Sequence, residues 1–121
     1  YALATVGLPA ARRAERIDEL LALVGLGHAA GRPARRLSSG EQQRLAFARV
    51  LLHRPDYLFL DEATSALDTE NEAHLYEELT RQLRTLALVS VAHRPTLQAY
   101  HNRALDLCGG RCNVGPLALV A

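Results

Sequence analysis

The chain alternates between segments whose apolar residues repeat at helical spacing and short segments that are apolar throughout. In residues 12–24 the apolar positions follow an i, i+3, i+4, i+7 pattern and charged residues occupy most others, which predicts an amphipathic helix. The apolar positions are Ile17, Leu20, Leu21 and Val24. Gly25 and Gly27 follow, and glycine is typical of the residues that end a helix.

Two further helices are predicted from residues that cap helix N-termini. Ser38 lies three positions before Glu41, the spacing of a capping box, and the apolar run at 45–52 indicates that the helix is buried. Thr69 and Glu72 repeat this spacing ahead of apolar residues at helical intervals. We therefore expect a second helix after the first of these boxes and a third helix after the other.

Two segments, 57–60 and 86–91, are apolar with little interruption, as expected for strands of a parallel sheet that helices cover on both faces. The strand at 57–60 is expected to be central. A short helical piece is predicted near Pro95, and a last strand at 103–107. Because strands alternate with helices along the chain, the pattern predicts an α/β fold with a parallel sheet.

Polar residues come soon after both apolar strands. Asp61 and Glu62 follow the first strand, and His93 follows the second. Ligands of open parallel sheets bind beyond the carboxyl ends of the strands, so these side chains are expected at one edge, where a phosphate and its metal would lie. Taken singly, each has a simpler interpretation: a carboxylate there can cap a helix or pair with Arg, and a loop histidine is more often structural.

A third polar element is the segment 37–41, which runs into the N-terminus of the second predicted helix. Free N–H groups and the positive end of the helix dipole attract an anion at such a place. Ser38 can be an N-cap and prepare an anion site at the same time, so the two interpretations are compatible. The three polar elements together point to phosphate chemistry.

Composition and charge narrow the classes of function. The 121 residues allow one domain at most. All 14 basic residues are Arg, so neither a Schiff-base Lys nor a phosphate-loop Lys can come from these residues. The arginines are scattered among 13 acidic residues, which leaves no basic footprint for nucleic acid. No apolar run approaches the roughly 20 residues that a membrane span needs.

Four short motifs resemble, in order and spacing, those of the ATP-binding cassette (ABC) ATPases. They are residues 37–44 for the signature, 57–62 for the Walker B strand with its catalytic Glu, 65–68 for the D-loop and His93 for the switch histidine. One such motif alone is weak, but four in this order are not expected by chance. The resemblance implies a partial P-loop NTPase fold, a parallel sheet flanked by helices and preceded by part of a helical subdomain.

The resemblance implies a role for each residue that follows the predicted strands. Asp61 would hold Mg²⁺, mostly through water, since Mg²⁺ keeps several waters and takes few carboxylates. Glu62 would orient or deprotonate the water that attacks ATP. His93 would bond the γ-phosphate and report its presence. The implied cofactors are therefore ATP and Mg²⁺.

Other residues of the motifs would act across a subunit boundary. By resemblance, the signature would bind ATP held by the opposite nucleotide-binding domain of a head-to-tail dimer. The signature residues are Ser38, Ser39, Gly40 and Glu41. Ser39 stands where many members of the family have Gly, which limits how closely the backbone approaches a phosphate. Ser65 and Asp68 belong to the D-loop, and Asp68 would help to fix the two subunits against each other.

A phosphate loop of the form G-x-x-x-x-G-K-[ST] is absent from these residues, because they include no Lys. In the family this loop, the adenine-stacking aromatic residue and the Gln loop precede the helical subdomain. We therefore expect the chain to be the C-terminal part of a nucleotide-binding domain. Residues 1–55 would be the helical-subdomain portion with the signature and following helix, and residues 56–121 the C-terminal part of the RecA-like core.

The resemblance implies that the cassette couples ATP hydrolysis to transport by a transmembrane permease domain, at the cytoplasmic face of the plasma membrane. Residues 45–55 and 90–97 resemble exporters with a fused permease, the group related to peroxisomal fatty-acyl half-transporters. Residues 5–33 resemble at least as much the cassettes of lipoprotein or macrolide export systems. Two alternatives stay open: an ABC-type ATPase of DNA repair or translation, and a non-catalytic fragment that contributes its signature alone to a partner's ATP site.

Overall fold

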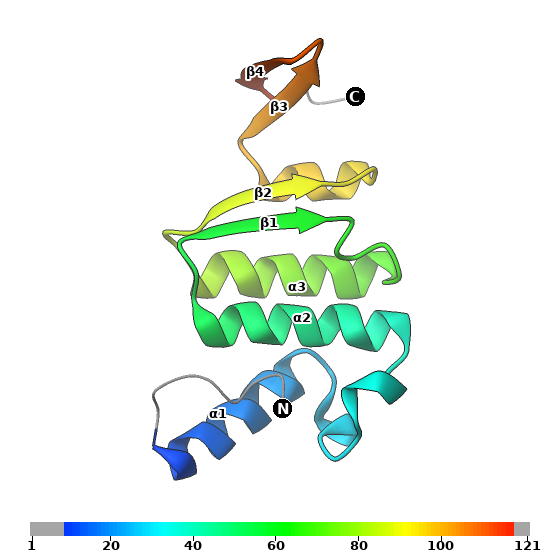
Figure 1. The fold of residues 1–121 in the computed structure, drawn as a ribbon, viewed down its shortest axis with the longest axis vertical. Coiled ribbons are helices and arrows are strands. Elements are labelled where there is room, and N and C mark those ends of the chain that lie inside the picture. Colours follow the sequence, from blue (N-terminus) through cyan, green and yellow to red (C-terminus); the bar gives the residue numbers. More distant parts are fainter. Residues whose placement is uncertain (1–8, 118–121) are drawn as a thin grey trace.

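The computed structural model of the chain describes residues 9–117, which form a layer of helices, a two-stranded parallel sheet and a separate hairpin (Figure 1). The α-helices are α1 (Ala10–Leu23), α2 (Ser39–His53) and α3 (Thr69–Gln82). The strands are β1 (Tyr57–Asp61), β2 (Ala87–Val91), β3 (Arg103–Cys108) and β4 (Arg111–Pro116). Short 3₁₀ helices occupy Gly27–Ala29 (η1), Ala34–Arg36 (η2) and Pro95–Tyr100 (η3). The three predicted α-helices are all present.

The three α-helices and the inner face of the parallel sheet enclose one apolar core. Along the stack, α2 lies between α1 and α3 (Figure 1). Phe47 of α2 meets Tyr76 of α3 with ring centroids 5.8 Å apart, an ordinary separation for a packed aromatic pair. The buried residues of the core are Leu20, Leu21, Val24, Leu26, Phe47, Ala48, Leu51, Leu52, Leu60, Leu67, Leu75, Tyr76, Leu79, Leu83 and Leu97.

Strands β1 and β2 form a parallel pair whose register runs from Tyr57 opposite Ala87 to Asp61 opposite Val91. This pairing confirms the predicted parallel sheet. Both strands point the same way in Figure 1, so their carboxyl ends lie at one side of the molecule together with the N-termini of α2 and α3. The residues that follow the two strands are therefore placed at one edge, as the sequence predicted.

The helices cover only one face of this pair. Leu60 packs into the core, whereas Tyr57 and Phe59, at alternate positions of β1, are 74% and 76% exposed. Val89 and Val91 of β2 are exposed as well. The expectation of a central strand covered on both faces is thus wrong within residues 9–117, where β2 is the one partner of β1. The apolar run could not distinguish a covered face from an open one, because both faces of the strand carry apolar residues.

Strand β3 belongs to an antiparallel hairpin instead of being a single last strand. Cys108 lies opposite Arg111 beside the turn, and Gly109 and Gly110 form the turn with φ of 56° and 74°. Positive φ at both positions suits a two-residue hairpin turn. Strand β4 was not predicted, because the Asn, Gly and Pro residues within 111–116 are typical of turns. This hairpin is a sheet separate from β1 and β2.

Candidate functional site

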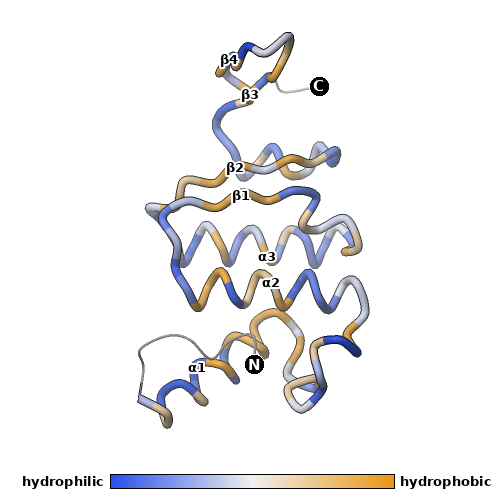
Figure 2. The backbone as a smooth tube through the Cα atoms, viewed as in Figure 1, coloured by the Kyte–Doolittle hydropathy of each residue, from blue (hydrophilic) through white to orange (hydrophobic). Residues whose placement is uncertain are grey.

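The carboxyl end of β1 carries two acidic residues. Figure 2 shows the hydrophobic residues of β1 giving way to hydrophilic ones at this point. Asp61 closes β1, and Glu62 follows with φ of 47°, a left-handed conformation that is uncommon for residues other than glycine. The Glu62 N–H donates to the carbonyl of Val91 at 2.9 Å, so β2 holds this turn in place. Strained residues held by their neighbours are common at functional sites.

His93, two residues after β2, lies beside Glu62. Its Nε2 is 3.0 Å from Glu62 Oε1, and the two side chains are 86% and 49% exposed. Asp61 is exposed, and within residues 9–117 its carboxylate takes part in no hydrogen bond or ion pair. The structure therefore brings Glu62 and His93 together next to Asp61. Both acids stay accessible at the edge and are not buried against arginines.

Ser38 begins α2 through the capping box that the sequence predicted. Its Oγ accepts the N–H of Glu41 at 3.2 Å, and Glu41 Oε2 accepts the N–H of Ser38 at 2.8 Å. Ser39 and Gly40 open the first turn, where backbone N–H groups lack an acceptor within the helix. Among the described residues, no hydrogen bond or ion pair joins this helix end to the residues at the end of β1.

Folding lowers the pKa of the Glu41 carboxyl below its usual value of 4.5. The main cause is the hydrogen bond from the Ser38 N–H, with a smaller opposing effect of desolvation and further help from His28 and Arg32. A carboxyl with a lowered folded-state pKa stabilises the folded protein when it is ionised. That stabilisation is present above pH 4.5 and is lost as the pH falls through the folded-state pKa.

Replacing Glu41 by Gln is expected to lower the free energy of unfolding at pH 7 and to have little effect at a pH below the folded-state pKa. Gln has the same size and can accept the Ser38 N–H, but it lacks the charge that strengthens this bond. Urea unfolding of both proteins, followed by circular dichroism at several pH values, measures the difference. A difference that stays constant with pH would contradict the assigned cause.

Ser38→Ala is the matched control for this pH dependence. It removes the hydroxyl half of the same capping box and is expected to lower the free energy of unfolding by about 1 kcal/mol. Because a hydroxyl does not titrate in this range, the size of this effect is expected to be similar at neutral and acidic pH.

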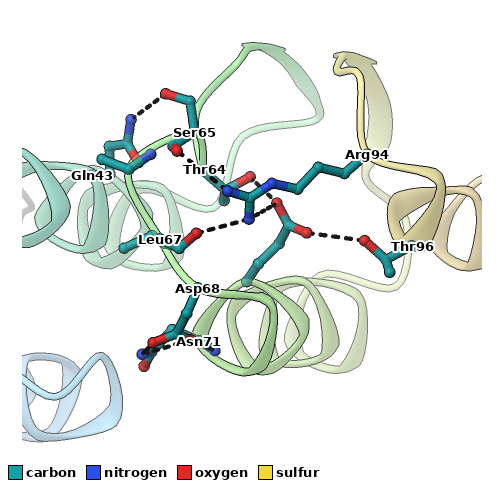
Figure 3. Close-up of polar contacts among 10 residues, drawn as sticks. Gln43, Thr64, Ser65, Leu67, Asp68, Asn71, Arg94 and Thr96 are labelled. Carbon is teal, nitrogen blue, oxygen red and sulfur yellow. Dashed lines mark hydrogen bonds and ion pairs between the residues drawn. The ribbon is translucent and has the colours of Figure 1, made fainter.

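Helix α2 also holds the loop that joins β1 to α3, residues 62–68. Gln43 Nε2 donates to Ser65 Oγ at 3.1 Å, and Gln43 Oε1 accepts the N–H of Ala66 at 3.0 Å (Figure 3). A Cβ on Gly40 would lie 3.3 Å from the Ala66 carbonyl oxygen, so the helix approaches this loop closely. The predicted signature and the predicted D-loop are thus attached to each other through Gln43. Gln43 lies within the predicted signature motif, but this role of its side chain was not predicted.

Asp68, and not Thr69, is the N-cap of α3. Its Oδ1 accepts the N–H of Asn71 at 2.8 Å, and this bond is the main cause of a lowered pKa of the Asp68 carboxyl. The predicted capping box of Thr69 and Glu72 is therefore wrong. Asp68 and Asn71 have the same spacing, and Asp is the stronger N-cap. Glu72 is instead buried, with 1% of its surface exposed.

The acidic residues at the carboxyl end of β1 could supply one or two ligands to a metal ion whose remaining ligands are waters and substrate phosphates. No cluster of three or more His, Cys, Asp or Glu side chains able to hold a metal occurs in residues 9–117. Mg²⁺ is usually bound by one or two carboxylates together with waters and substrate phosphates. Asp61 is accessible and has no hydrogen-bond or ion-pair partner in this part of the chain, so it fits that mode of binding.

A cavity of about 290 Å³ lies at the opposite end of the sheet. Its walls come from residues 54–56, which precede β1, and from residues 81–85, which precede β2. Ligands of parallel sheets bind beyond the carboxyl ends of the strands, so this cavity is not part of the candidate site. The candidate site is an exposed edge.

No helix in the described part of the chain is long and apolar enough to cross a membrane.

The parallel strands and the residues at their carboxyl ends place the chain in the α/β class of P-loop NTPase folds. Residues 4–65 match the family model described as ABC transporter, and the chain belongs to the ABC transporter family. The chain is also similar to a solved structure of a metal-chelate type ABC transporter in an inward-facing conformation. The TM-score is 0.69 at 27% identity, over 94% of this chain and 47% of that one.

Two curated relatives illustrate the family. The mycobactin import ATP-binding/permease protein IrtB of Mycolicibacterium smegmatis is 47% identical over 106 residues, which cover 86% of this chain and 18% of the relative. The chloroplastic ABC transporter D family member 2 of Arabidopsis thaliana is 52% identical over 71 residues, which cover 59% of this chain and 10% of the relative. The chain thus matches less than a fifth of the length of each.

Proposed function

We propose that the chain is part of an ATP-binding and ATP-hydrolysing domain that drives transport across a membrane. The observation that carries this proposal is the contact of 3.0 Å between Glu62 and His93, beside the accessible Asp61. A base, a hydrogen-bond donor and a free carboxylate at one edge suit the hydrolysis of a magnesium-bound nucleoside triphosphate. The relatives are transporter proteins, which favours transport over DNA repair or translation.

In this proposal each residue at the edge has one task. Asp61 would hold Mg²⁺, mostly through water, and the metal would supply positive charge to neutralise the phosphates. Glu62 orients the attacking water and accepts its proton, while the water oxygen bonds to the γ-phosphorus and the bond to the ADP oxygen breaks. His93 donates a hydrogen bond to the γ-phosphate, and its contact with Glu62 orients both side chains.

The N-terminus of α2 is proposed to bind the γ-phosphate of ATP held by a second nucleotide-binding domain in a head-to-tail dimer. The residues that would do so are Ser38, Ser39, Gly40 and Glu41. A capped helix end with free N–H groups supports this role, since such an end attracts phosphate. Ser65 and Asp68 are exposed on the neighbouring loop and would help to fix the two domains together.

The division of the chain is likewise a proposal. Residues 1–55 would be the helical-subdomain portion with the signature and α2, and residues 56–121 the C-terminal part of the RecA-like core. The chain turns sharply between α2 and β1, where Arg54 has φ of 50°, and this turn supports the boundary. A permease domain is the proposed membrane partner, which would place the cassette at the cytoplasmic face of the plasma membrane.

The 121-residue chain alone is expected to hydrolyse ATP weakly or not at all. It has no Lys for a phosphate loop, so most of the electrostatic stabilisation of the phosphates must come from other residues of the domain. Steady-state phosphate release, measured with and without Mg²⁺ on this chain and on the full-length protein, tests the expectation. Robust magnesium-dependent hydrolysis by the chain alone would contradict it, and absence of turnover in the full-length protein would contradict the proposed function.

The role of the helix end in trans has a separate test. The chain is mixed with a complete nucleotide-binding domain whose own signature is disabled but whose Walker B acids are intact, and ATP turnover is measured before and after mixing. Recovered turnover that Ser38→Ala reduces supports binding of the partner's ATP. If the chain restores no turnover, the trans role is contradicted.

A further inference from the structure

Glu72, on α3, is a buried carboxylate that the proposed function does not use. It is 1% exposed and accepts three hydrogen bonds, from Thr64 Oγ1 at 2.6 Å, Thr96 Oγ1 at 3.1 Å and Arg94 Nη1 at 3.3 Å (Figure 3). A buried charge is costly unless it is paired and hydrogen-bonded, and here both conditions are met. The three donors come from two separate segments, the loop after β1 and the segment after β2.

Arg94 connects this buried carboxylate to the main chain of the loop 62–68. Its Nη1 donates to the Leu67 carbonyl at 2.7 Å, and its Nη2 donates to the Ser65 carbonyl at 3.3 Å. One guanidinium group therefore bonds two carbonyls of the loop and the Glu72 carboxylate at once (Figure 3). The planar fork of Arg suits several acceptors in fixed directions.

The loop 62–68 is thus held from two sides. Gln43 of α2 bonds it at Ser65 and Ala66, and Arg94 bonds it from the opposite segment. Glu62 begins this loop, and His93 directly precedes Arg94 in the chain. A displacement of Arg94 would therefore move both ends of the Glu62–His93 contact.

We propose that Glu72 and Arg94 form a positioning pair that fixes the loop 62–68 to the segment carrying His93. Neither residue is assigned a contact with ATP, and both act through Glu62, His93 and the loop. The pair aligns the residues of one domain with each other and holds the predicted D-loop in the shape it presents to a second domain. This inference rests on the proposed function, because the alignment concerns ATP hydrolysis.

The first test compares Arg94→Lys and Glu72→Gln with the wild type in the full-length protein. Lys keeps the charge, but a single ammonium cannot reproduce the two-nitrogen fork. Gln keeps the shape of Glu72 but removes the charge that holds the guanidinium. Each variant is expected to lower kcat for ATP about 10-fold or more, as small misplacements of reacting groups do, while KM stays within about 2-fold. Unchanged kcat in both variants would overturn the proposal.

The second test separates positioning from simple stabilisation. In the double variant Glu72→Leu with Arg94→Met, apolar side chains replace both members of the pair. Glu72 is buried and Arg94 is 37% exposed, so apolar replacement of both removes an ion pair with one buried member, which often restores stability. It cannot restore the bonds to the Ser65 and Leu67 carbonyls. The double variant is expected to unfold at a higher urea concentration than Glu72→Gln and still to hydrolyse ATP slowly. Recovery of wild-type turnover would overturn the positioning role.

A measurement that does not depend on turnover distinguishes failure of this inference from failure of the proposed function. Amide hydrogen exchange of residues 65–67 is expected to be faster in Arg94→Lys than in the wild type, because the loop loses the paired bonds from the Arg94 guanidinium to its Ser65 and Leu67 carbonyls. The matched control is Arg81→Lys, because the Arg81 side chain is 63% exposed and pairs with Glu78, another residue of α3. If the wild type hydrolyses no ATP, the proposed function fails. If exchange in this loop is the same in Arg94→Lys and in the wild type, the positioning pair fails.

Discussion

Replacing Glu62 by Gln in the full-length protein is expected to lower ATP turnover by about 100-fold or more while ATP binding persists. General-base catalysis typically contributes factors of this size, and Gln keeps the shape of the side chain but cannot accept a proton at neutral pH. The same substitution weakens the contact with His93, whose Nε2 lies 3.0 Å from the carboxylate. The expected result is therefore a lower kcat, with the KM for ATP little changed.

Phosphate release under saturating ATP and equilibrium binding of a fluorescent ATP analogue measure these two quantities. Glu15→Gln is the matched control, because Glu15 is an exposed acid on α1 that is remote in sequence from the edge of β1. It is expected to change neither quantity. Wild-type turnover in Glu62→Gln would exclude this residue as the base, whereas loss of ATP binding would point to a role in holding the nucleotide.

The two phenylalanines of the chain are expected to differ greatly in how much stability is lost when each is replaced by Ala. Phe47 is 2% exposed and packs against Tyr76, whereas Phe59 is 76% exposed on the open face of β1. Phe47→Ala removes a buried ring and leaves a cavity, which is expected to cost about 3–5 kcal/mol. That is a large part of the stability of a domain of this size.

Phe59→Ala is expected to change the free energy of unfolding of the 121-residue chain by no more than about 0.5 kcal/mol. It is also expected to raise solubility, because it reduces an apolar surface that includes Tyr57, Val89 and Val91. Urea unfolding and light scattering at increasing protein concentration measure the two effects. A similar loss of stability in both variants would contradict the one-sided cover of the sheet.

The sequence predicted the elements well where their signals are local. The helix at 12–24 and the strand at 57–60 each agree with the structure within about two residues, because their periodicity reflects which side chains face the core. The capping box at Ser38 was also predicted correctly, since both of its bonds lie within four residues. The box at Thr69 was wrong because two overlapping pairs had the same spacing and only one could begin the helix.

In the candidate site, too, local features were predicted from the sequence and contacts between distant residues were not. The sequence placed Asp61 and Glu62 after one strand and His93 after another, and parallel pairing brought Glu62 and His93 to 3.0 Å. The roles of these residues rest on the resemblance to the ABC family and stay predictions. Gln43 and Arg94, which hold the loop between the strand and α3, were not predicted, because their partners lie 22–29 residues away along the chain.

The amino-acid sequence alone determined the order of the three α-helices and of β1 to β3, the family and the residues that follow β1 and β2, because periodicity, caps and motifs are properties of neighbouring positions. Tertiary structure decided which face of the sheet is covered and how the polar side chain of Glu72 can be buried. Both depend on side chains that meet across elements. Burial of a carboxylate is tolerated only when distant donors surround it, and such an arrangement exists only after the chain has folded.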